Sequence, residues 1–229
     1  MKRHFDPATP ELMDRPQPVT PELVSDLRNI RQLNRHFGSY ALIEHFLQRW
    51  ITPAAQLRVL DLATGSGDIP RLVIDYARKV NATVTVDAID QQASTLKIAR
   101  DLSADYPEID FKTGDVLAFA DSAKYDIVLC SLALHHFDDD AAVRLLWRCQ
   151  ELSRRYVLVS DLRRGLLATI GAYLLTAFIF RDSMTRTDAR LSVSRAFSFR
   201  EFRSLAERAG WKNFGHRKFR FARQAVWIE

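Results

Sequence analysis

The chain has little of what marks several common protein classes. Among its 229 residues it has only two cysteines, Cys130 and Cys149, and no metal-ligand spacing stands out. We therefore expect no disulfide framework and no bound metal, and both thiols should stay reduced, as is usual in the cytoplasm. The residues after Met1 are polar and lack the apolar segment of a secretory signal, which also favours a cytoplasmic protein.

Long runs of charged residues of one sign, and apolar runs long enough to span a membrane, are also missing. The 33 lysines and arginines outnumber the 28 acidic residues, but they are spread along the chain, so no nucleic-acid partner is expected. The most apolar segment, residues 165–180, is shorter than the about 20 residues that a membrane-spanning helix needs. We predict a buried helix or a substrate-pocket wall there and no stable membrane insertion; a membrane anchor is the alternative.

The segment 1–52 is predicted to form an arm and a helical cap. Residues 1–19 are polar and rich in proline, which favours an extended arm over the surface. Residues 20–22 read Thr-Pro-Glu, a capping hydroxyl followed by a proline at the first helical position and an acid. Gly38 should end this helix, and Ser39 is expected to cap a second one.

From residue 53 to 229 we expect one domain in which strand-like and helix-like segments alternate. Such alternation is typical of an α/β fold with a doubly wound, mostly parallel sheet. The last two strands lie close together in the sequence, which suits an antiparallel hairpin. The seven expected strands cover residues 57–62, 83–89, 109–112, 125–130, 156–160, 212–219 and 222–228, and the helices between them cover residues 68–79, 91–105, 139–152 and 198–209.

The most informative stretch is Val59–Ile69, a strand that ends in an acid and is followed by a glycine turn and a helix start. Open α/β sheets bind ligands at such turns, and glycine lets the backbone approach a ligand closely. A dinucleotide site has a third glycine or alanine where this chain has Pro70, and Asp61 would repel a pyrophosphate. A carboxylate there suits a ligand that carries an ammonium group.

This stretch resembles the first motif of the class I S-adenosylmethionine-dependent methyltransferases. The resemblance implies S-adenosylmethionine as the cofactor and a Rossmann-like fold whose parallel sheet ends in an antiparallel hairpin. Asp90 lies at the tip of the second strand, where an acid can accept both ribose hydroxyls, although a helix cap is the alternative. Gln91 is expected to contact the adenosine as well.

The later family motifs follow in order. The resemblance implies that Asp115 accepts the adenine amino hydrogens, that Val116 packs on the adenine ring, and that the segment 125–137 runs under the methionine part of the cofactor. The expected cofactor-binding residues are thus Asp61, Ala63, Gly65, Gly67, Asp90, Gln91, Asp115, Val116, Ser131 and Leu132.

Two histidines are candidates for catalysis. His135 and His136 should lie near the transferred methyl group, and an imidazole can act as a general base near neutral pH; a role in packing is the alternative. Asp161 ends the fifth strand and either contacts substrate or caps the next helix. In this family an insertion such as residues 162–197 commonly builds the acceptor pocket, and its apolar face indicates an apolar or aromatic acceptor.

A narrower resemblance rests on residues 11–18, 27–38 and 195–197. These pieces are similar to bacterial small-molecule methyltransferases found with type III polyketide synthases. The implied activity is O- or C-methylation of a phenolic or quinone-like acceptor in secondary metabolism, with the N-terminal helices closing as a lid. The alternatives are a nicotinamide-dependent oxidoreductase and a non-catalytic cofactor-binding or membrane-surface protein. The acceptor and the oligomeric state stay open.

Overall fold

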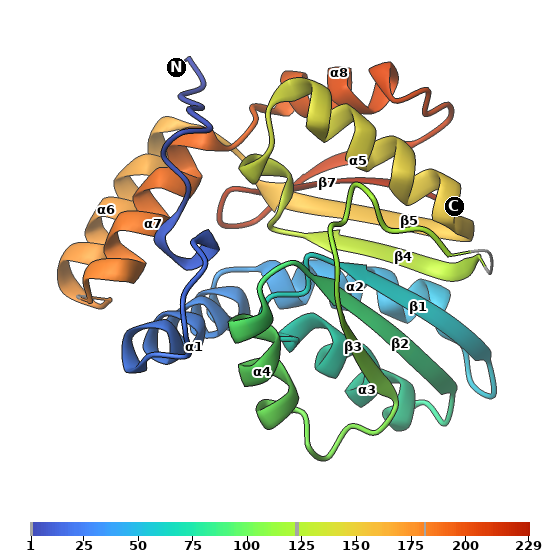
Figure 1. The fold of residues 1–229 in the computed structure, drawn as a ribbon. Helices are drawn as coiled ribbons and strands as arrows, with labels where there is room; N and C mark the ends of the chain where they lie inside the picture. Colours follow the sequence, from blue (N-terminus) through green and yellow to red (C-terminus); the bar gives the residue numbers. More distant parts are fainter. Residues whose placement is uncertain (1, 122–123, 181) are drawn as a thin grey trace.

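Seven strands form one sheet in the computed structural model, which describes residues 2–121, 124–180 and 182–229 (Figure 1). Their order is β3–β2–β1–β4–β5–β7–β6, and β7 alone runs opposite to the other six strands. The predicted doubly wound sheet with a final hairpin is therefore confirmed. The strands are β1 (Gln56–Leu62), β2 (Thr83–Asp90), β3 (Ile109–Thr113), β4 (Tyr125–Ser131), β5 (Ser153–Leu162), β6 (Gly215–Phe219) and β7 (Arg223–Ile228).

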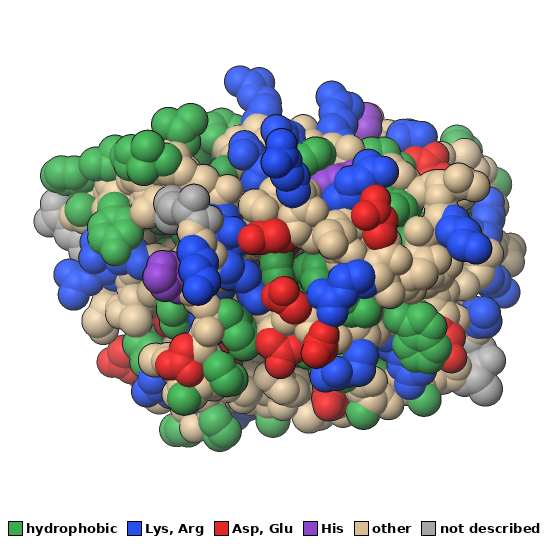
Figure 2. All heavy atoms as spheres, turned by 90° about the horizontal axis from the view of Figure 1, so that it is seen from above, with side chains coloured by type: hydrophobic (Ala, Val, Ile, Leu, Met, Phe, Trp, Pro, Cys, Tyr) green, Lys and Arg blue, Asp and Glu red, His purple; other side chains and the backbone are tan. Residues whose placement is uncertain are grey.

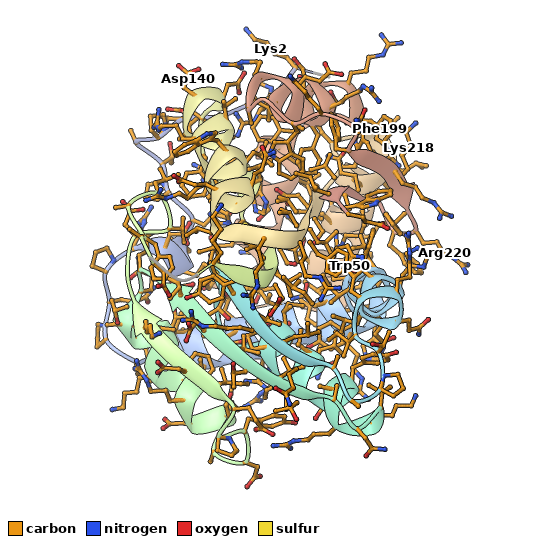
Figure 3. The ribbon with its side chains drawn as sticks, turned by 90° about the vertical axis from the view of Figure 1, so that its right-hand side faces the viewer. Lys2, Trp50, Asp140, Phe199, Lys218 and Arg220 are labelled. Atoms are coloured by element: carbon orange, nitrogen blue, oxygen red, sulfur yellow. The ribbon has the colours of Figure 1, made fainter. Side chains whose placement is uncertain are left out.

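Helices cover both faces of this sheet because successive strand residues point to opposite sides. In β1, Val59 belongs to one buried cluster and Leu60 to the other. Trp50 closes the first cluster by stacking on Tyr156, with ring centroids 4.8 Å apart; Figure 3 shows it beside the sheet. The first face carries α2 (Ser39–Trp50), α3 (Asp68–Lys79) and α4 (Ala93–Leu102), and the second carries α5 (Asp139–Leu152) and α8 (Phe199–Arg208).

The N-terminal helices begin where the sequence indicated, with one correction. The helix α1 (Pro21–His36) is capped by Thr20, whose hydroxyl accepts a hydrogen bond from Leu23 N at 3.2 Å. The cap of α2 is Gly38, in a left-handed conformation, so the prediction for Ser39 was wrong. Ser39 is the first helical residue instead, and its hydroxyl accepts a hydrogen bond from Arg223. The division of the chain at residue 53 stays a prediction.

The proline-rich arm lies over the surface, as predicted, with most of its residues exposed and Glu11 buried. It runs between α7 (Ser183–Arg195) and the carboxyl ends of the strands (Figure 1) and contains a short 3-10 helix, η1 (Leu12–Asp14). Arg3 donates hydrogen bonds to the carbonyls of Arg195 and Phe137, both at 2.6 Å. Asp188 accepts hydrogen bonds from two backbone amides of η1. Proline composition alone could not reveal these distant contacts.

The predicted insertion forms two packed helices, α6 (Leu166–Phe178) and α7. The expectation of a buried α6 was wrong, because Leu167 is 85% exposed and Phe178 is 69% exposed. Apolar residues lie on all sides of α6, but only one side of the helix packs against the rest of the protein. The other side is exposed and forms the hydrophobic end of the molecule in Figure 2. Its inner side lines a cavity, as the pocket-wall alternative required. Across the described ranges, every helix is too short or too polar to cross a lipid bilayer.

Candidate active site

A cavity of about 960 Å³ opens at the carboxyl ends of the strands. Ligand pockets usually measure about 300–1,000 Å³, so this cavity lies at the large end of the usual range. The cavity lies where the strand order reverses between β1 and β4, which is the usual ligand site of such a sheet. Because Leu62 pairs with both Ile89 and Cys130, the three strand tips end level and present their loops together.

Two of these loops hold a non-glycine residue in a left-handed conformation. Ala63 has φ 59° and Leu132 has φ 57°. Such conformations cost on the order of 1–3 kcal/mol and persist where the surrounding structure enforces them. Here Thr64 N donates to Ile89 O at 2.9 Å, and Leu132 N donates to Ser160 O at 2.8 Å. The loops are therefore fixed by backbone hydrogen bonds before any ligand arrives.

The structure brings most of the predicted cofactor residues to this cavity. Asp61 and Gly67 are the two that do not reach its wall. Whether each residue binds the cofactor stays a prediction. The residues on the wall are Ala63, Gly65, Asp90, Gln91, Asp115, Val116, Ser131 and Leu132.

Asp90 joins the first two loops. Its carboxylate accepts hydrogen bonds from Gly65 N at 2.8 Å and from Gln92 N at 2.9 Å. Burial raises the pKa of Asp90 above its ordinary value. Each carboxylate oxygen can accept a further hydrogen bond, so ribose binding and support of α4 are compatible.

The two predicted residues off the wall have other environments. Asp61 is buried, and neither of its carboxylate oxygens has a hydrogen-bond partner. Burial raises the pKa of Asp61 to about 8, and the carboxylates of Asp68 and Asp90 add to the rise against the neighbouring Thr64 hydroxyl. A buried acid favours a nearby cation, although Asp61 itself lies behind the cavity wall. Gly67 has φ 71°, and a Cβ atom there would lie 2.8 Å from the Phe111 ring, so this glycine packs the turn on β3.

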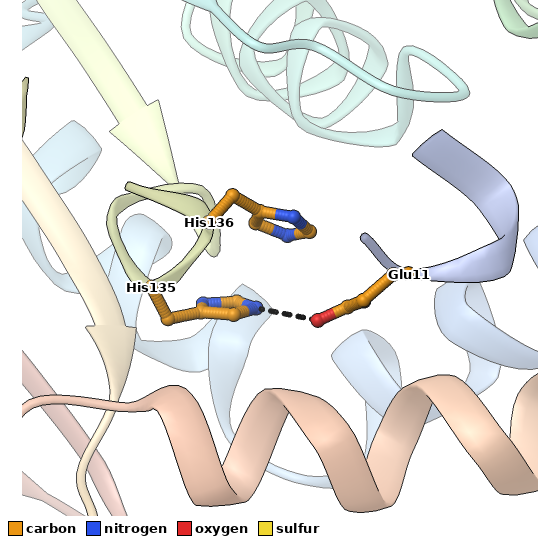
Figure 4. Close-up of side chains that lie close together, drawn as sticks. All are labelled: Glu11, His135 and His136. Atoms are coloured by element: carbon orange, nitrogen blue, oxygen red, sulfur yellow. Dashed lines mark ion pairs between the residues drawn. The ribbon is translucent and has the colours of Figure 1, made fainter. Parts of the chain in front are cut away.

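Beyond these loops, the cavity wall includes three buried or partly buried side chains that lie close together, Glu11, His135 and His136, which we call the His–Glu cluster (Figure 4). His135 Nε2 lies 3.7 Å from Glu11 Oε1. His135 Nδ1 lies 2.7 Å from Asp161 Oδ1, and Asp161 also accepts a hydrogen bond from His135 N at 2.8 Å. Asp161 therefore orients His135, and its side chain also accepts the backbone amide of Leu162.

The second histidine is held from the arm. His136 Nδ1 lies 2.6 Å from Asp14 Oδ2. Burial lowers the pKa of His136, but the carboxylates of Glu11, Asp14 and Asp161 outweigh burial and raise it to about 10. In the ligand-free protein His136 is thus a charged partner of these acids at neutral pH. The general-base role of the two histidines stays a prediction.

Sequence reasoning missed Glu11 and Asp14 as site residues. Both lie in the segment 11–18, which had been noticed only for its narrower family resemblance. The third piece contacts the arm just before the first, because Arg195 donates hydrogen bonds to the carbonyls of Asp6 and Thr9. The available signal was thus the set of distant pieces, two of which, residues 11–18 and 27–38, contribute to the wall of one cavity.

Comparisons with known proteins relate the chain to methyltransferases. Residues 59–155 match the family model of the methyltransferase domain. The 2-phytyl-1,4-naphtoquinone methyltransferase of Thermosynechococcus vestitus is 35% identical over 82 residues. That match covers 36% of this chain and 35% of the relative, so it spans about a third of the relative's length.

Solved structures share the fold over almost the whole chain. The plantazolicin methyltransferase BpumL, in complex with SAH, has a TM-score of 0.67 at 13% identity, covering 91% of this chain and 90% of that one. The magnesium protoporphyrin IX methyltransferase ChlM of Synechocystis PCC 6803, with bound SAH, has a TM-score of 0.58 at 17% identity, covering 94% and 90%. Residues 59–155 are therefore a methyltransferase domain within the class I fold, as the resemblance implied, and S-adenosylmethionine is indicated as its cofactor.

Proposed function

We propose that this chain transfers a methyl group from S-adenosylmethionine to a small apolar or aromatic acceptor of phenolic or quinone-like character. The observation that carries the proposal is one cavity whose wall includes the strand-tip loops, apolar side chains of α1 and α6, and the His–Glu cluster. A cavity at the large end of the usual range suits a cofactor together with a second molecule. The bound cofactor supplies an electrophilic methyl group, so the chain mainly has to position the two partners.

The cofactor half of the cavity consists of the strand-tip loops that carry Gly65, Asp90, Asp115 and Leu132. The wall at Gly65 is open, because an added Cβ there would meet no atom within 4 Å. Asp90 offers carboxylate oxygens suited to ribose hydroxyls, and the buried acid Asp61 favours a cationic ligand. These features suit S-adenosylmethionine better than a dinucleotide, whose pyrophosphate the acidic groups would repel.

The acceptor half is lined by the arm, α1, α6 and α7. Its walls are largely apolar, and its polar groups include the His–Glu cluster as well as Asp26 and Asp188. An aromatic ring suits the apolar walls, while a ring hydroxyl can reach the polar cluster, which takes up or holds its proton. The curated relative is named for a naphthoquinone acceptor, which supports a ring-shaped acceptor here. The apolar wall is formed by Leu27, Ile30, Leu33, Leu166, Leu174 and Leu175.

A transfer assay with methyl-labelled S-adenosylmethionine and a panel of phenols, hydroquinones and aliphatic alcohols tests the proposal. We expect label in aromatic acceptors, and calorimetry should show binding of S-adenosylmethionine but not of NAD. Heat on addition of NAD alone would favour an oxidoreductase. Cofactor binding without transfer to any member of the panel would contradict the acceptor class.

A further inference from the structure

The His–Glu cluster has the arrangement of a metal site. One ligand atom from each of Glu11, His135 and His136 lies within 4.8 Å of the other two. Figure 4 shows the three side chains converging from η1 and from η2 (Leu134–His136), the 3-10 helix after β4. Metal bonds of about 2.0–2.2 Å place neighbouring ligands somewhat closer together, so small side-chain rotations would close the site.

The other nitrogen of each imidazole is already held by a carboxylate. Asp161 holds Nδ1 of His135 and Asp14 holds Nδ1 of His136, at 2.7 and 2.6 Å. This leaves Nε2 of each ring as the free ligand atom. Metal-binding histidines almost always show this pattern, in which an outer carboxylate fixes the tautomer and the ring orientation. Two such pairs beside a third acid are a more specific signal than an acidic cluster.

The charges around the cluster also favour a cation. Three carboxylates, those of Glu11, Asp14 and Asp161, surround the two imidazoles in a largely buried place. Arginines also lie near these acids: Arg3 donates to backbone carbonyls and Asp139, Arg195 donates to carbonyls of the arm, and the buried Arg223 interacts electrostatically with Asp161. A divalent ion at the centre would lie among these carboxylates and offset their buried charge, which is costly to leave unpaired.

We propose that Glu11, His135 and His136 bind a divalent transition-metal ion, with the remaining coordination positions open to the acceptor. Two imidazoles and one carboxylate suit Zn²⁺, Fe²⁺, Co²⁺ or Mn²⁺ better than Mg²⁺ or Ca²⁺, which prefer all-oxygen sites. Catalytic metal sites commonly keep three protein ligands and an open position. The sequence predicted no metal because its ligands come from segments far apart in the chain.

The inference deepens the proposed function and rests on it for the identity of the acceptor. The open face of the site belongs to the acceptor half of the cavity. A hydroxyl that reaches the ion loses its proton to water as its oxygen binds the metal, so a phenol is held there as phenolate. The oxygen then forms a bond to the methyl carbon as the carbon–sulfur bond of the cofactor breaks. The acceptor is thus a phenol whose oxygen can ligate a metal.

Cobalt binding to the tag-free, full-length protein tests the inference after treatment with a chelator. We expect one equivalent of Co²⁺ to give visible absorption bands, and Glu11→Gln and His135→Ala to weaken binding at least 100-fold. Asp14→Asn, which changes only an outer carboxylate, should weaken binding about 10–100-fold. His45→Ala is the control, since His45 lies on α2 away from the cavity. Unchanged binding in both ligand variants, or no stoichiometric binding, would overturn the inference.

Two further measurements separate this inference from the proposed function. Calorimetry should give the same affinity for S-adenosylmethionine in Glu11→Gln as in the parent chain. Methyl transfer should be lost on chelation and restored by the metal. Full methyl transfer by the metal-free protein would contradict a role for the metal site and leave the methyltransferase proposal intact. Stoichiometric cobalt binding without any binding of S-adenosylmethionine would support the metal site and contradict the methyltransferase proposal. Because Glu11→Gln preserves side-chain shape, its thermal unfolding should match that of the parent.

Discussion

The two halves of the cavity are built in different ways. In the cofactor half, Gly65, Asp90 and Leu132 directly follow or end neighbouring strands, and backbone hydrogen bonds fix their loops. In the acceptor half, Glu11 and His135 meet from opposite ends of the sequence, and side-chain contacts hold them. A cofactor site of this kind is a local property of strand and turn, whereas the acceptor site exists only after the arm, α6 and α7 have packed.

The largest expected effect on ligand binding comes from placing a bulky side chain in one half of the cavity at a time. Gly65→Leu should abolish binding of S-adenosylmethionine, because the new side chain enters open space in the cofactor half. Its left-handed backbone, φ 54°, adds a stability cost of about 1–2 kcal/mol. Gly171→Leu is the matched variant, since Gly171 also faces open space but on α6.

Gly171→Leu should leave cofactor affinity unchanged and raise KM for the acceptor, and leucine should not weaken the helix. Calorimetry and steady-state kinetics on both variants check the pair. Loss of cofactor binding in Gly171→Leu would show that the two halves are not separable.

Removing the arm should separate turnover from cofactor binding. Deletion of residues 1–19 removes Glu11 and Asp14 and opens the acceptor half to water. We expect turnover to fall more than 100-fold, while affinity for S-adenosylmethionine changes less than tenfold. Circular dichroism and thermal melting should show a folded core. Full activity of the truncated chain would make the arm incidental to catalysis.

Asp61 gives the cofactor half a pH dependence. With a pKa raised to about 8 by burial, its carboxyl is mostly protonated at pH 7 in the ligand-free protein. An ammonium group favours the carboxylate, so binding should release up to about one proton and strengthen between pH 6 and 8. Calorimetry in two buffers with different ionisation enthalpies measures this release.

Asp61→Asn should eliminate the proton release and weaken cofactor binding about 100-fold, as expected for loss of a buried charge partner. Release that persists in this variant would assign the proton to another group.

Asp90→Ala should weaken cofactor binding at least tenfold. Two hydrogen bonds to a charged acceptor are lost, each worth about 1.5–3 kcal/mol. The variant also releases Gly65 N from its partner, so a modest loss of thermal stability should accompany the effect. Asp90→Asn keeps one acceptor oxygen, so its cofactor affinity should lie between those of Asp90→Ala and the parent protein. If only stability changes and affinity does not, Asp90 supports the loops without binding ribose.

The smallest effect concerns the packing of α1 on α7 in the acceptor half. Burial raises the pKa of Asp26 to about 7; the carboxylates of Asp188, Asp182 and Glu11 add to the rise, against the hydrogen bond from Thr185. The folded state therefore prefers the protonated acid. Its destabilising effect is absent below about pH 4, grows as the pH rises, and is complete above about pH 7.

Asp26→Asn should remove this dependence and raise the melting temperature at pH 8 by several degrees, with little change at pH 4. Thermal melting across that range measures it. A parallel decline in both proteins would show that another group carries the pH dependence.

Sequence patterns predicted the cofactor half of the cavity better than the acceptor half. The motif at Val59–Ile69 predicted a strand, a turn and a helix, and β1 and α3 lie there because the pattern of apolar residues and glycines acts locally. The same reasoning did not foresee the contacts between the arm and α7, and for α6 it could not choose between a buried helix and a pocket wall. Proline content and hydropathy describe a segment's own preferences, while burial depends on what packs against it.

By itself, the sequence determined the sheet, its final hairpin and the residues of the cofactor loops, since strand period, turn chemistry and motif order involve neighbouring residues. Only the tertiary structure decided that Glu11 and Asp14 join His135 and His136, because that contact depends on how a distant arm closes over the strand ends. No local pattern encodes such a meeting. It arises from the packing of η1 against α7, where Asp188 accepts the backbone amides of Leu12 and Met13.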